Sequence, residues 1–396
     1  MIPRARHLAA AALSSSLLML PALTGTATAA AWNAHSATGY TAAGSAITTS
    51  TVTTSAVTSS TAAAPISKVY AVPLARTVAD VKRVANYWKP DRLKKSDSYS
   101  PATPGAAAPA SSTAAAAAPA NPVAGVRRSI AAQSVAPALP RKGSAMTMGK
   151  VFFRFGDKEY WCSASSIAAK NRSVVATAAH CAYDSRQAKP ADYWIFVPNP
   201  GTNGETPDGI YVGASISLHE DWMGKVDYDY DYAFVTVNRG FTWVAKNGDY
   251  VMQDVGRLQD NVGGLGIELN KKPGSYTARP FGYPAGAQPD GSRPFDGKTL
   301  LECPERSTRY TVAPGLDLQK GVELQPCDFS HGASGGPWVI GYDKNRKLGS
   351  LNGVNSLTWN RDARDRYDAV SSPYFDTTTG EVYRRAAAQS TVSNVT

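Results

Sequence analysis

From about Lys150 onward the sequence predicts an all-β fold. Short runs rich in Val, Ile, Tyr, Phe and Trp recur there, and Gly, Pro, Asn and Asp separate them. Strands at this spacing are typical of a β-sandwich or of barrels rather than of alternating strands and helices. The roughly 235 residues involved suit one large β unit or two small barrels. The runs are Val151–Phe155, Tyr160–Ile167, Ser173–Thr177, Tyr193–Val197, Ile210–Ile216, Ala233–Val237, Tyr276–Gly282, Arg309–Val312, Val322–Leu324, Trp338–Gly341 and Leu348–Val354.

Two low-complexity tracts lie before this β unit. Between Ala31 and Pro65, 25 of 35 residues are Ala, Thr or Ser, and none is charged. Between Pro101 and Gly125, 17 of 25 are Ala or Pro, again without charge. Such composition offers too little apolar surface to offset the entropy of ordering the chain. We therefore expect residues 30–147 to be a low-complexity leader rather than a domain.

The first 29 residues are predicted to be a secretory signal peptide. A basic start, Arg4 to His7, precedes an apolar run from Leu8 to Leu23, and Ala27-Thr-Ala29 forms the small-x-small pattern of a cleavage site. A membrane anchor needs about 20 unbroken apolar residues, which this serine-interrupted run does not reach. We expect cleavage near Ala29 or Ala30, a secreted, extracellular protein, and no membrane anchor after cleavage.

The net charge of +10 is concentrated in the leader. Residues 1–145 hold 14 Lys or Arg against 3 Asp or Glu, whereas residues 146–396 hold 27 against 28. A duplex-binding domain needs clustered basic side chains to displace counterions, and the β unit has no such excess. We therefore expect no nucleic-acid partner.

One segment of the leader has the pattern of a short helix near 77–88. Thr77 and Asp80 have the spacing of a helix cap, the apolar residues from Val78 to Trp88 share one helical face, and Pro90 ends the run. Two interpretations stand. The segment is either a transient helix in a disordered leader or a pro-segment that docks on the catalytic domain of a zymogen.

The cysteines predict two disulfide bonds. All four, Cys162, Cys181, Cys303 and Cys327, lie in the β unit, and an oxidising compartment allows them to pair. Counting alone leaves three connectivities open. Pairing nearest neighbours closes two short loops, each worth roughly 3 kcal/mol in the loop-entropy model. A structural zinc site is the rival interpretation, but no Cys-x-x-Cys spacing occurs, so we expect no metal.

Histidine is scarce, which narrows the candidates for acid–base chemistry. Of five histidines, only His180, His219 and His331 lie in the β unit. His180 ends an apolar β run and precedes Cys181, so we expect it at a strand end that faces a cleft. His219 lacks such a setting and is interpreted as a surface or structural histidine. His331 either lines the substrate cleft or is an exposed loop residue.

The segment Gly332-Ala-Ser-Gly-Gly-Pro337 is a candidate nucleophile turn centred on Ser334. A reactive serine needs a turn that exposes its hydroxyl and leaves nearby N–H groups free for the oxyanion, and glycines permit such a turn. The segment also fits the nucleophile elbow of α/β-hydrolases. Those enzymes need a histidine after the serine, and none follows Ser334.

A carboxylate between the histidine and the serine is needed to orient the imidazole. Asp227, Asp229 and Asp231 are the candidates, and Asp231 directly precedes the apolar strand Ala233–Val237. A residue at the lip of a core strand is better placed to be buried, so we choose Asp231 over Asp229. The alternative interpretations are a solvated loop and a calcium loop, which would want more oxygen ligands than this segment supplies.

The order His180, Asp231, Ser334, with the motifs Thr177-Ala-Ala-His-Cys181, Asp231-Tyr-Ala-Phe and Gly332-Ala-Ser-Gly-Gly-Pro, resembles the trypsin/chymotrypsin-like serine peptidases. Their secreted actinobacterial branch is the most similar. The resemblance covers about residues 148–360 and implies two six-stranded antiparallel β-barrels, the chymotrypsin-like architecture. It also implies a Cys162–Cys181 bridge. We place the peptidase domain at 148–383 and a flexible tail at 384–396.

The resemblance implies a role for each motif residue. Ser334 would attack the peptide carbonyl, His180 would transfer the proton, and Asp231 would fix the histidine tautomer. The backbone N–H groups of Gly332 and Ser334 would form the oxyanion hole. We therefore expect a secreted, monomeric serine endopeptidase that acts on a protein or peptide substrate through an acyl-enzyme intermediate and needs no metal or organic cofactor.

Ala333 departs from family members that are activated by burying a new N-terminal amine, because those carry Asp immediately before the nucleophile. That salt bridge cannot form here, so we expect a preformed oxyanion hole. Leader cleavage, for which the basic pairs Arg127-Arg128 and Arg141-Lys142 are candidate sites, would then relieve steric blockage.

Four residues are candidates for substrate binding. Asp328 lies six residues before Ser334, the offset at which trypsin-like enzymes place the carboxylate that pairs with Lys or Arg. However, Cys327 does not lie where the family has its cysteine, so the alignment of Asp328 with that carboxylate stays open. The alternative interpretation of Asp328 is a turn residue. His331 is the second candidate. By analogy, Asn355 and Ser356 lie on the opposite wall of the pocket.

Two other functions stay open at this point. A noncatalytic β-barrel binding protein on an Ala/Thr-rich stalk would not react with a serine-directed probe. A serine esterase would use the same triad and cleave no peptide.

Overall fold

The computed structural model describes residues 68–99, 134–141, 145–246 and 248–395. The predicted signal peptide, both low-complexity tracts and the Arg127-Arg128 pair lie outside the described residues. The boundaries expected for the leader and the peptidase domain therefore stay predictions.

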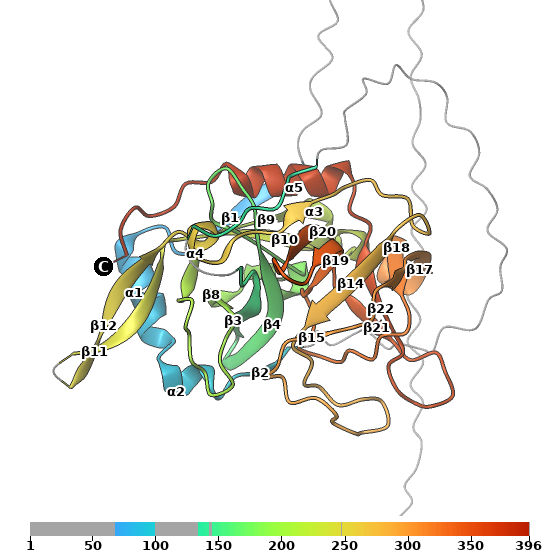
Figure 1. Cartoon of the computed structure of the whole chain (residues 1–396), viewed down its shortest axis with the longest axis horizontal. Helices are drawn as coiled ribbons and strands as arrows, with labels where there is room; N and C mark the ends of the chain where they lie inside the picture. The colour runs from blue at the N-terminus through green and yellow to red at the C-terminus, as the bar shows by residue number, and fades with distance from the viewer. Residues whose placement is uncertain (1–67, 100–133, 142–144, 247, 396) are drawn as a thin grey trace, which may run out of the picture. The chain divides into compact units, whose positions relative to one another are not determined.

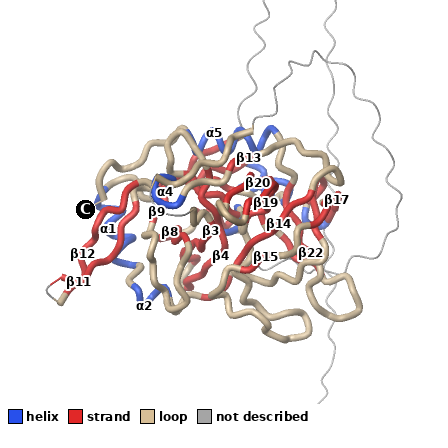
Figure 2. Tube along the Cα trace, in the orientation of Figure 1, coloured by secondary structure: helices blue, strands red, loops and turns tan. Residues whose placement is uncertain are grey.

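Six strands close an antiparallel barrel in the first half of the β unit (Figures 1 and 2). Hydrogen-bonded neighbours follow the order β9-β10-β5-β4-β3-β8, and β8 also pairs with β9, which completes the ring. Alternate apolar side chains of these strands, such as Val151, Phe153 and Val235, are completely buried in one core cluster. The strands are β3 (Met148–Phe155), β4 (Lys158–Ile167), β5 (Val174–Thr177), β8 (Asp192–Pro198), β9 (Tyr211–His219) and β10 (Ala233–Val237).

The second half of the β unit is built from two separate sheets. One has the order β13-β20-β19-β14-β15, with β16 also pairing with β14, and the other has the order β17-β18-β22-β21. Their strands are β13 (Gly266–Ile267), β14 (Thr277–Gly282), β15 (Leu301–Glu302), β16 (Arg306–Ser307), β19 (Pro337–Asp343), β20 (Leu348–Val354), β17 (Arg309–Ala313), β18 (Leu318–Leu324), β21 (Leu357–Trp359) and β22 (Ala369–Pro373).

The expectation of a second closed barrel is not confirmed. In the described residues the two sheets of the second half meet at β20 and β22, where the Ser372 hydroxyl, rather than a backbone carbonyl, accepts the Val354 N–H at 3.0 Å. At the other edge β14 divides its pairing between the two-residue strands β15 and β16. The described chain is thus mostly β, with one closed six-stranded antiparallel barrel.

Each strand run expected from the sequence overlaps a strand of the structure. The hairpin of β11 (Gly240–Lys246) and β12 (Asp249–Gly256) was not expected, nor were β21 and β22. The same part of the chain also holds the short hairpin of β6 (Tyr183–Asp184) and β7 (Lys189–Pro190), the helices α3 (Glu220–Lys225) and α4 (Leu258–Val262), and the 3-10 turns Ala179–Cys181, Tyr228–Tyr230 and Pro314–Leu316. No helix in the described ranges is long and apolar enough to cross a membrane.

The expected helix in the leader is confirmed as α1 (Val78–Tyr87). Thr77 is its N-cap, and reciprocal bonds between Thr77 and Asp80 form a capping box. Helix α1 ends before Pro90, as expected, and Pro90 then begins the short helix α2 (Pro90–Leu93), because proline suits the first turn of a helix. The strands β1 (Val69–Pro73) and β2 (Asp97–Ser98) flank the two helices and pair with β9 and β4 of the barrel.

The segment expected to be a flexible tail from residue 384 differs in the structure. Helix α5 (Thr377–Ala387), capped by Asp376, runs past that boundary and packs against the barrel. The Thr236 hydroxyl donates to the Ala386 carbonyl at 2.8 Å. Further along, Val395 is completely buried. The apolar residues of α5 and of the last residues find a partner surface that composition alone does not show.

Candidate active site

His180 lies in the 3-10 turn that follows β5, at the rim of the closed barrel. Its side chain is 2% exposed. Small residues precede it, so the turn packs closely, and the disulfide from Cys162 to Cys181 ties it to β4. The Trp194 indole N–H donates to the Cys181 carbonyl at 3.1 Å and also holds the turn. The prediction of His180 at a strand end is confirmed.

Asp231 lies between the 3-10 turn Tyr228–Tyr230 and β10, and its side chain is completely buried. Its Oδ1 accepts the His180 backbone N–H at 2.9 Å, and its Oδ2 lies 2.8 Å from His180 Nδ1. The Ser356 hydroxyl donates to the same Oδ2 at 2.6 Å. A carboxylate at Nδ1 selects the tautomer that protonates Nδ1 and leaves Nε2 free to accept a proton.

Asp229, the rejected candidate, serves a different part of the structure. Its Oδ1 accepts the backbone N–H groups of Gln319 and Lys320, at 2.9 and 2.7 Å, and so holds the start of β18. Asp231, next to the core strand β10, therefore reaches His180, whereas Asp229, two residues earlier, does not.

Ser334 is partly exposed on the loop between β18 and β19. Gly332 and Gly335 on either side of it have φ values of +97° and +78°, which glycine adopts without strain. In the described part of the chain, the backbone N–H groups of Gly332 and Ser334 donate no hydrogen bond, whereas that of Gly335 donates to the Asn355 carbonyl at 2.7 Å. The loop thus leaves two N–H groups available, as an oxyanion hole requires.

Ser163 joins the serine loop to the strands that carry the histidine. Its backbone N–H donates to the Ser334 carbonyl at 2.8 Å, and its hydroxyl donates to the Gly332 carbonyl at 2.8 Å. Its own carbonyl accepts the Thr177 hydroxyl at 2.9 Å. This anchoring residue was not expected from the sequence, although it directly follows the half-cystine Cys162.

The structure brings Asp231 to His180 but shows no hydrogen bond between His180 and Ser334. His180 Nε2 is buried and has no hydrogen-bond partner among the described residues. The serine loop nevertheless approaches the histidine closely, because a Cβ on Gly335 would lie 2.1 Å from Thr177 Oγ1 and 2.8 Å from the Ala178 nitrogen. Hydrogen bonds of catalytic groups are often long without substrate and tighten when it binds.

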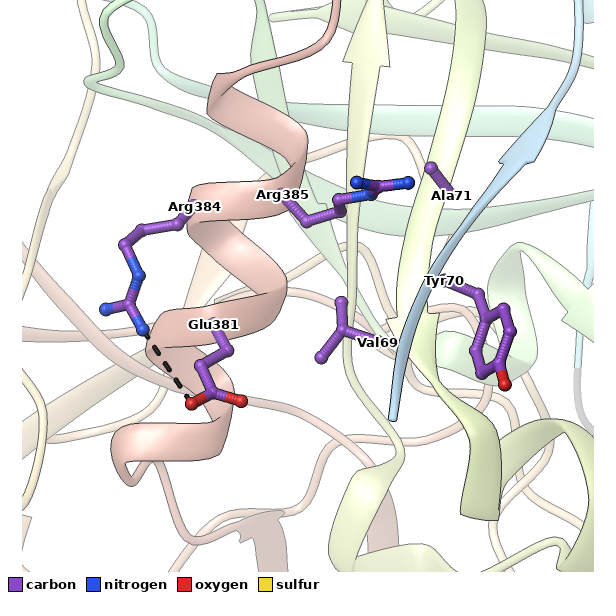
Figure 3. Close-up of a pocket in the computed structure, with 6 residues that line it drawn as sticks. All are labelled: Val69, Tyr70, Ala71, Glu381, Arg384 and Arg385. Atoms are coloured by element: carbon purple, nitrogen blue, oxygen red, sulfur yellow. Dashed lines mark ion pairs between the residues drawn. The ribbon is translucent and has the colours of Figure 1, made fainter. Parts of the chain in front are cut away.

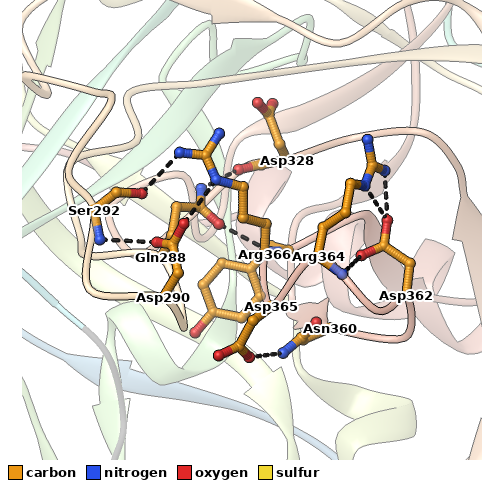
Figure 4. A network of polar contacts seen from close by, with 10 residues as sticks. Gln288, Asp290, Ser292, Asp328, Asn360, Asp362, Arg364, Asp365 and Arg366 are labelled. Atoms are coloured by element: carbon orange, nitrogen blue, oxygen red, sulfur yellow. Dashed lines mark hydrogen bonds and ion pairs between the residues drawn. The ribbon is translucent and has the colours of Figure 1, made fainter.

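Asp328 and His331, two of the substrate-binding candidates, lie on the approach to the serine loop. Asp328 is exposed, and its backbone carbonyl accepts the Gln288 amide at 2.8 Å (Figure 4). Gln288 also accepts the Tyr367 N–H, while Arg366 pairs with Asp290 at 2.9 Å, so the network ties three loops together.

His331 is half-buried, and its carbonyl accepts the backbone N–H groups of Ala285 and Gly286. Burial, with the nearby His180 and Arg293, lowers the pKa of His331. The imidazole is therefore neutral at neutral pH, so it offers a neutral donor or acceptor rather than a positive charge.

Asn355 is buried, whereas Ser356 is partly exposed and directs its hydroxyl to Asp231. The Asn355 amide donates to the carbonyls of Phe281 and Ala333, both at 2.9 Å, and its oxygen accepts the Trp338 indole at 2.8 Å. Asn355 therefore supports the serine loop from below, and Ser356 holds Asp231. Both side chains make hydrogen bonds within the protein, and their expected place on the pocket wall stays a prediction.

The remaining histidine and the cysteines have structural places. His219 caps α3, where its Nδ1 accepts the Asp221 N–H at 3.2 Å, and its ring stacks on Tyr230 at 3.8 Å. It is a structural, buried histidine. The disulfides are Cys162–Cys181 and Cys303–Cys327, as nearest-neighbour pairing predicts. The cluster of His180 with Cys162 and Cys181 cannot ligate a metal through sulfur, because both thiols are oxidised.

One cavity of about 540 Å³ lies elsewhere, between β1 and α5 (Figure 3). Its lining comprises Val69, Tyr70, Ala71, Glu381, Arg384 and Arg385. None of the site residues lines it, so it contributes nothing to the chemistry argued above.

Comparison with known proteins agrees with this arrangement. No protein-family model and no curated protein matches the chain. Among solved structures, a thermostable serine protease, AL20, from an extremophilic microorganism is 27% identical, with a TM-score of 0.50, over 62% of this chain and 99% of that one. The protease Anisep from Arthrobacter nicotinovorans is 29% identical over 64% and 100%, with a TM-score of 0.49. A Glu endopeptidase is 16% identical over 66% and 99%, with a TM-score of 0.44.

The closed barrel and the likeness to AL20 place the chain with the chymotrypsin-like serine peptidases, which confirms the resemblance drawn from the sequence. A peptidase function, and hence a hydrolase, is supported at this level.

Proposed function

We propose that this protein is a secreted serine endopeptidase in which His180, Asp231 and Ser334 act as a triad. The observation that carries the proposal is the buried His180–Asp231 pair, whose Nδ1–Oδ2 distance is 2.8 Å and whose Nε2 has no partner among the described residues. Within the described part of the chain, the backbone N–H groups of Gly332 and of Ser334 itself donate no hydrogen bond. Activation of a serine requires a base whose lone pair is free to accept the hydroxyl proton, close to the turn that carries the hydroxyl.

In the proposed reaction the Ser334 hydroxyl oxygen attacks the carbonyl carbon of the scissile peptide while its proton passes to His180 Nε2. The oxyanion accepts hydrogen bonds from the backbone N–H groups of Gly332 and Ser334. When the C–N bond breaks, His180 gives the proton to the leaving amine, and an acyl-enzyme ester remains. Water then repeats the sequence and releases the acid.

The proposal extends to substrate specificity through the residues before the serine loop. Asp328 is exposed before the serine loop, so its carboxylate is available to pair with a Lys or Arg side chain of the substrate. His331 would contact the substrate as a neutral imidazole. Asn355 and Ser356 would act by positioning, through the serine loop and Asp231 respectively. If Asp328 selects basic residues, Asp328→Asn will reduce cleavage after Lys and Arg relative to other residues in a peptide library.

Secretion and a monomeric state are part of the proposal. The two disulfides fit an oxidising compartment outside the cytoplasm. Expression of the full chain in a secreting host, followed by N-terminal sequencing of the exported protein, tests the expected cleavage near Ala29.

A fluorophosphonate probe tests the catalytic proposal directly. We expect one adduct, on Ser334, and no adduct in Ser334→Ala, together with cleavage of a mixed peptide library by the unmodified enzyme only. Absence of the adduct would instead favour the binding-protein alternative. Hydrolysis of a small ester without cleavage of any peptide would favour an esterase.

A further inference from the structure

The leader segment Lys68–Tyr99 is joined to the barrel by a continued sheet. Strand β1 pairs with β9 over five residues, from Val69 opposite His219 to Pro73 opposite Ser215. The pairing continues when Leu74 N donates to Ala214 O at 2.9 Å and Ala75 N to Gly213 O at 3.1 Å. Without β1, this part of β9 would have unpaired backbone groups on that side.

Helix α1 closes an apolar surface on the outside of the barrel. Val81, Ala85 and Trp88 on its inner face are completely buried. They belong to one cluster with the outward-pointing barrel residues Phe152, Ile195, Val197 and Val212 and with Phe241 of the neighbouring strand β11. Removal of the segment would expose these side chains together as a patch of the kind that soluble proteins rarely present to water.

Specific polar contacts fix the helix on this surface. The Trp88 indole N–H donates to the Tyr193 carbonyl at 2.5 Å, and the Tyr87 ring stacks on the Tyr193 ring at a centroid distance of 3.9 Å. The Tyr87 hydroxyl donates to Glu159 at 2.7 Å, and Arg92 pairs with the same carboxylate. These contacts fix both the position and the orientation of α1 on the barrel.

The end of the segment reaches the active site. Strand β2 pairs with β4 beside Trp161, and Tyr99 N donates to the Trp161 carbonyl at 3.0 Å. The Tyr99 ring packs against Tyr160 at 4.9 Å, and its centroid lies 6.0 Å from that of His180. Trp161 in turn touches the oxyanion loop, because a Cβ on Gly332 would lie 2.5 Å from its ring. Tyr99 remains partly exposed.

We propose that Lys68–Tyr99 is a permanent part of the catalytic unit, retained when the leader is cut after Tyr99, and that Tyr99 forms a substrate-contacting wall beside His180. The second part rests on the proposed function. Because this wall is made of Tyr99 with Tyr160 and Phe155, it favours an apolar substrate side chain at the position that it contacts. The segment is then neither a transient helix nor an inhibitor that dissociates.

The first test cuts the full chain between residues 110 and 125, where a site for a specific protease is inserted. We expect the N-terminal fragment to co-elute with the rest in gel filtration without denaturant, and peptide cleavage to stay within about threefold of the value before elution. A fragment that separates under these conditions while activity is retained or rises would overturn the proposal. Co-elution is measured without turnover, so it decides the structural part even if no peptide is cleaved.

The second test concerns Tyr99. In Tyr99→Ala we expect the preference for apolar over charged substrate residues to fall at least fivefold through KM, with kcat within about twofold, and Tyr99→Phe to behave as the unmodified protein. Tyr70→Ala, at an exposed position of β1, is the control from the same segment. An unchanged residue preference in Tyr99→Ala would refute the wall. If the unmodified protein neither cleaves peptides nor labels on Ser334, it is the proposed function that fails.

Discussion

His180 and Asp231 come from a barrel whose six strands close by hydrogen bonds, whereas Ser334 lies on a loop between two sheets that stay open. The first pair is held by direct contact, with Asp231 bonded to both the backbone and the ring of His180. The serine is held through its backbone, because Ser163 donates to the carbonyls of Ser334 and Gly332, and the two glycines beside it have positive φ. The base is therefore preset by the barrel, whereas the nucleophile depends on how its loop packs against that barrel.

Loss of the carboxylate on the barrel side is expected to have the largest effect. Asp231→Asn would keep the shape but lose the charge and the preferred histidine tautomer, so kcat should fall by roughly 10⁴. Asp229→Asn is the matched control, because that carboxylate bonds β18 instead, and its kcat should stay within a few-fold. Steady-state kinetics on one peptide measures both. Equal losses in the two variants would contradict the assignment of Asp231.

On the loop side, Gly335→Ala tests the close packing of the nucleophile turn. The new Cβ would lie 2.1 Å from Thr177 Oγ1, so the loop must shift away from the barrel. We expect kcat/KM to fall by about 10²-fold or more, since small displacements at the reacting atoms are costly.

Gly291→Ala separates that contact from backbone strain. Gly291 also has a positive φ, +82°, but a Cβ there would meet nothing within 4 Å. This variant should lose only about 1 kcal/mol of stability and little activity. If both glycine variants lose activity alike, strain rather than packing against Thr177 is responsible.

The same contrast explains how much could be predicted from the sequence. Local sequence patterns were enough to predict His180, the paired cysteines and the strand runs. The position of Asp231 directly before an apolar strand is also a local feature. Ser163 and Ser356 could not be found in this way, because their partners are 171 and 125 residues away in the chain. The docking of α1 and of the last residues likewise depends on a surface formed by distant strands.

The second closed barrel shows the opposite limit. The family resemblance implied it, and every strand run behind that expectation overlaps a strand. What the runs cannot specify is how their edges pair, and β14 divides its edge between two very short strands. Element type follows from local composition, whereas closure depends on register between strands far apart in the chain.

Lys150 sits where the two halves meet and gives a test of stability. Its Nζ lies 3.9 Å from the centroid of the Trp161 ring, on the barrel, and 5.1 Å from that of Tyr283, after β14. Burial lowers the pKa of Lys150 from its ordinary 10.5 to about 7, with Asp296 opposing and Lys298 adding to the shift.

Because the unfolded chain keeps the proton up to pH 10.5, stability should rise with pH between about 7 and 10.5 as the folded lysine becomes neutral. Lys150→Met removes this slope. The free energy of unfolding of the variant, relative to that of the unmodified protein, should be higher at pH 6 than at pH 9 by on the order of 2 kcal/mol. Urea unfolding at the two pH values measures the difference. Lys158→Met, at an exposed position of β4, is the control, and a Lys150→Met difference that does not depend on pH would refute the burial argument.

Ser356 gives the smallest effect and joins the halves through a single hydrogen bond. Its hydroxyl donates to Asp231 Oδ2 at 2.6 Å from the second half of the molecule. Ser356→Ala removes one charge-assisted bond but leaves both bonds from His180, so kcat/KM should fall only about tenfold, or about 1.4 kcal/mol. Ser371→Ala, in the neighbouring strand β22, removes a buried hydroxyl without a partner among the described residues and should change kcat/KM less than twofold. A loss near 10⁴ in Ser356→Ala would instead mean that the barrel alone does not preset the histidine, and that its geometry depends on both halves.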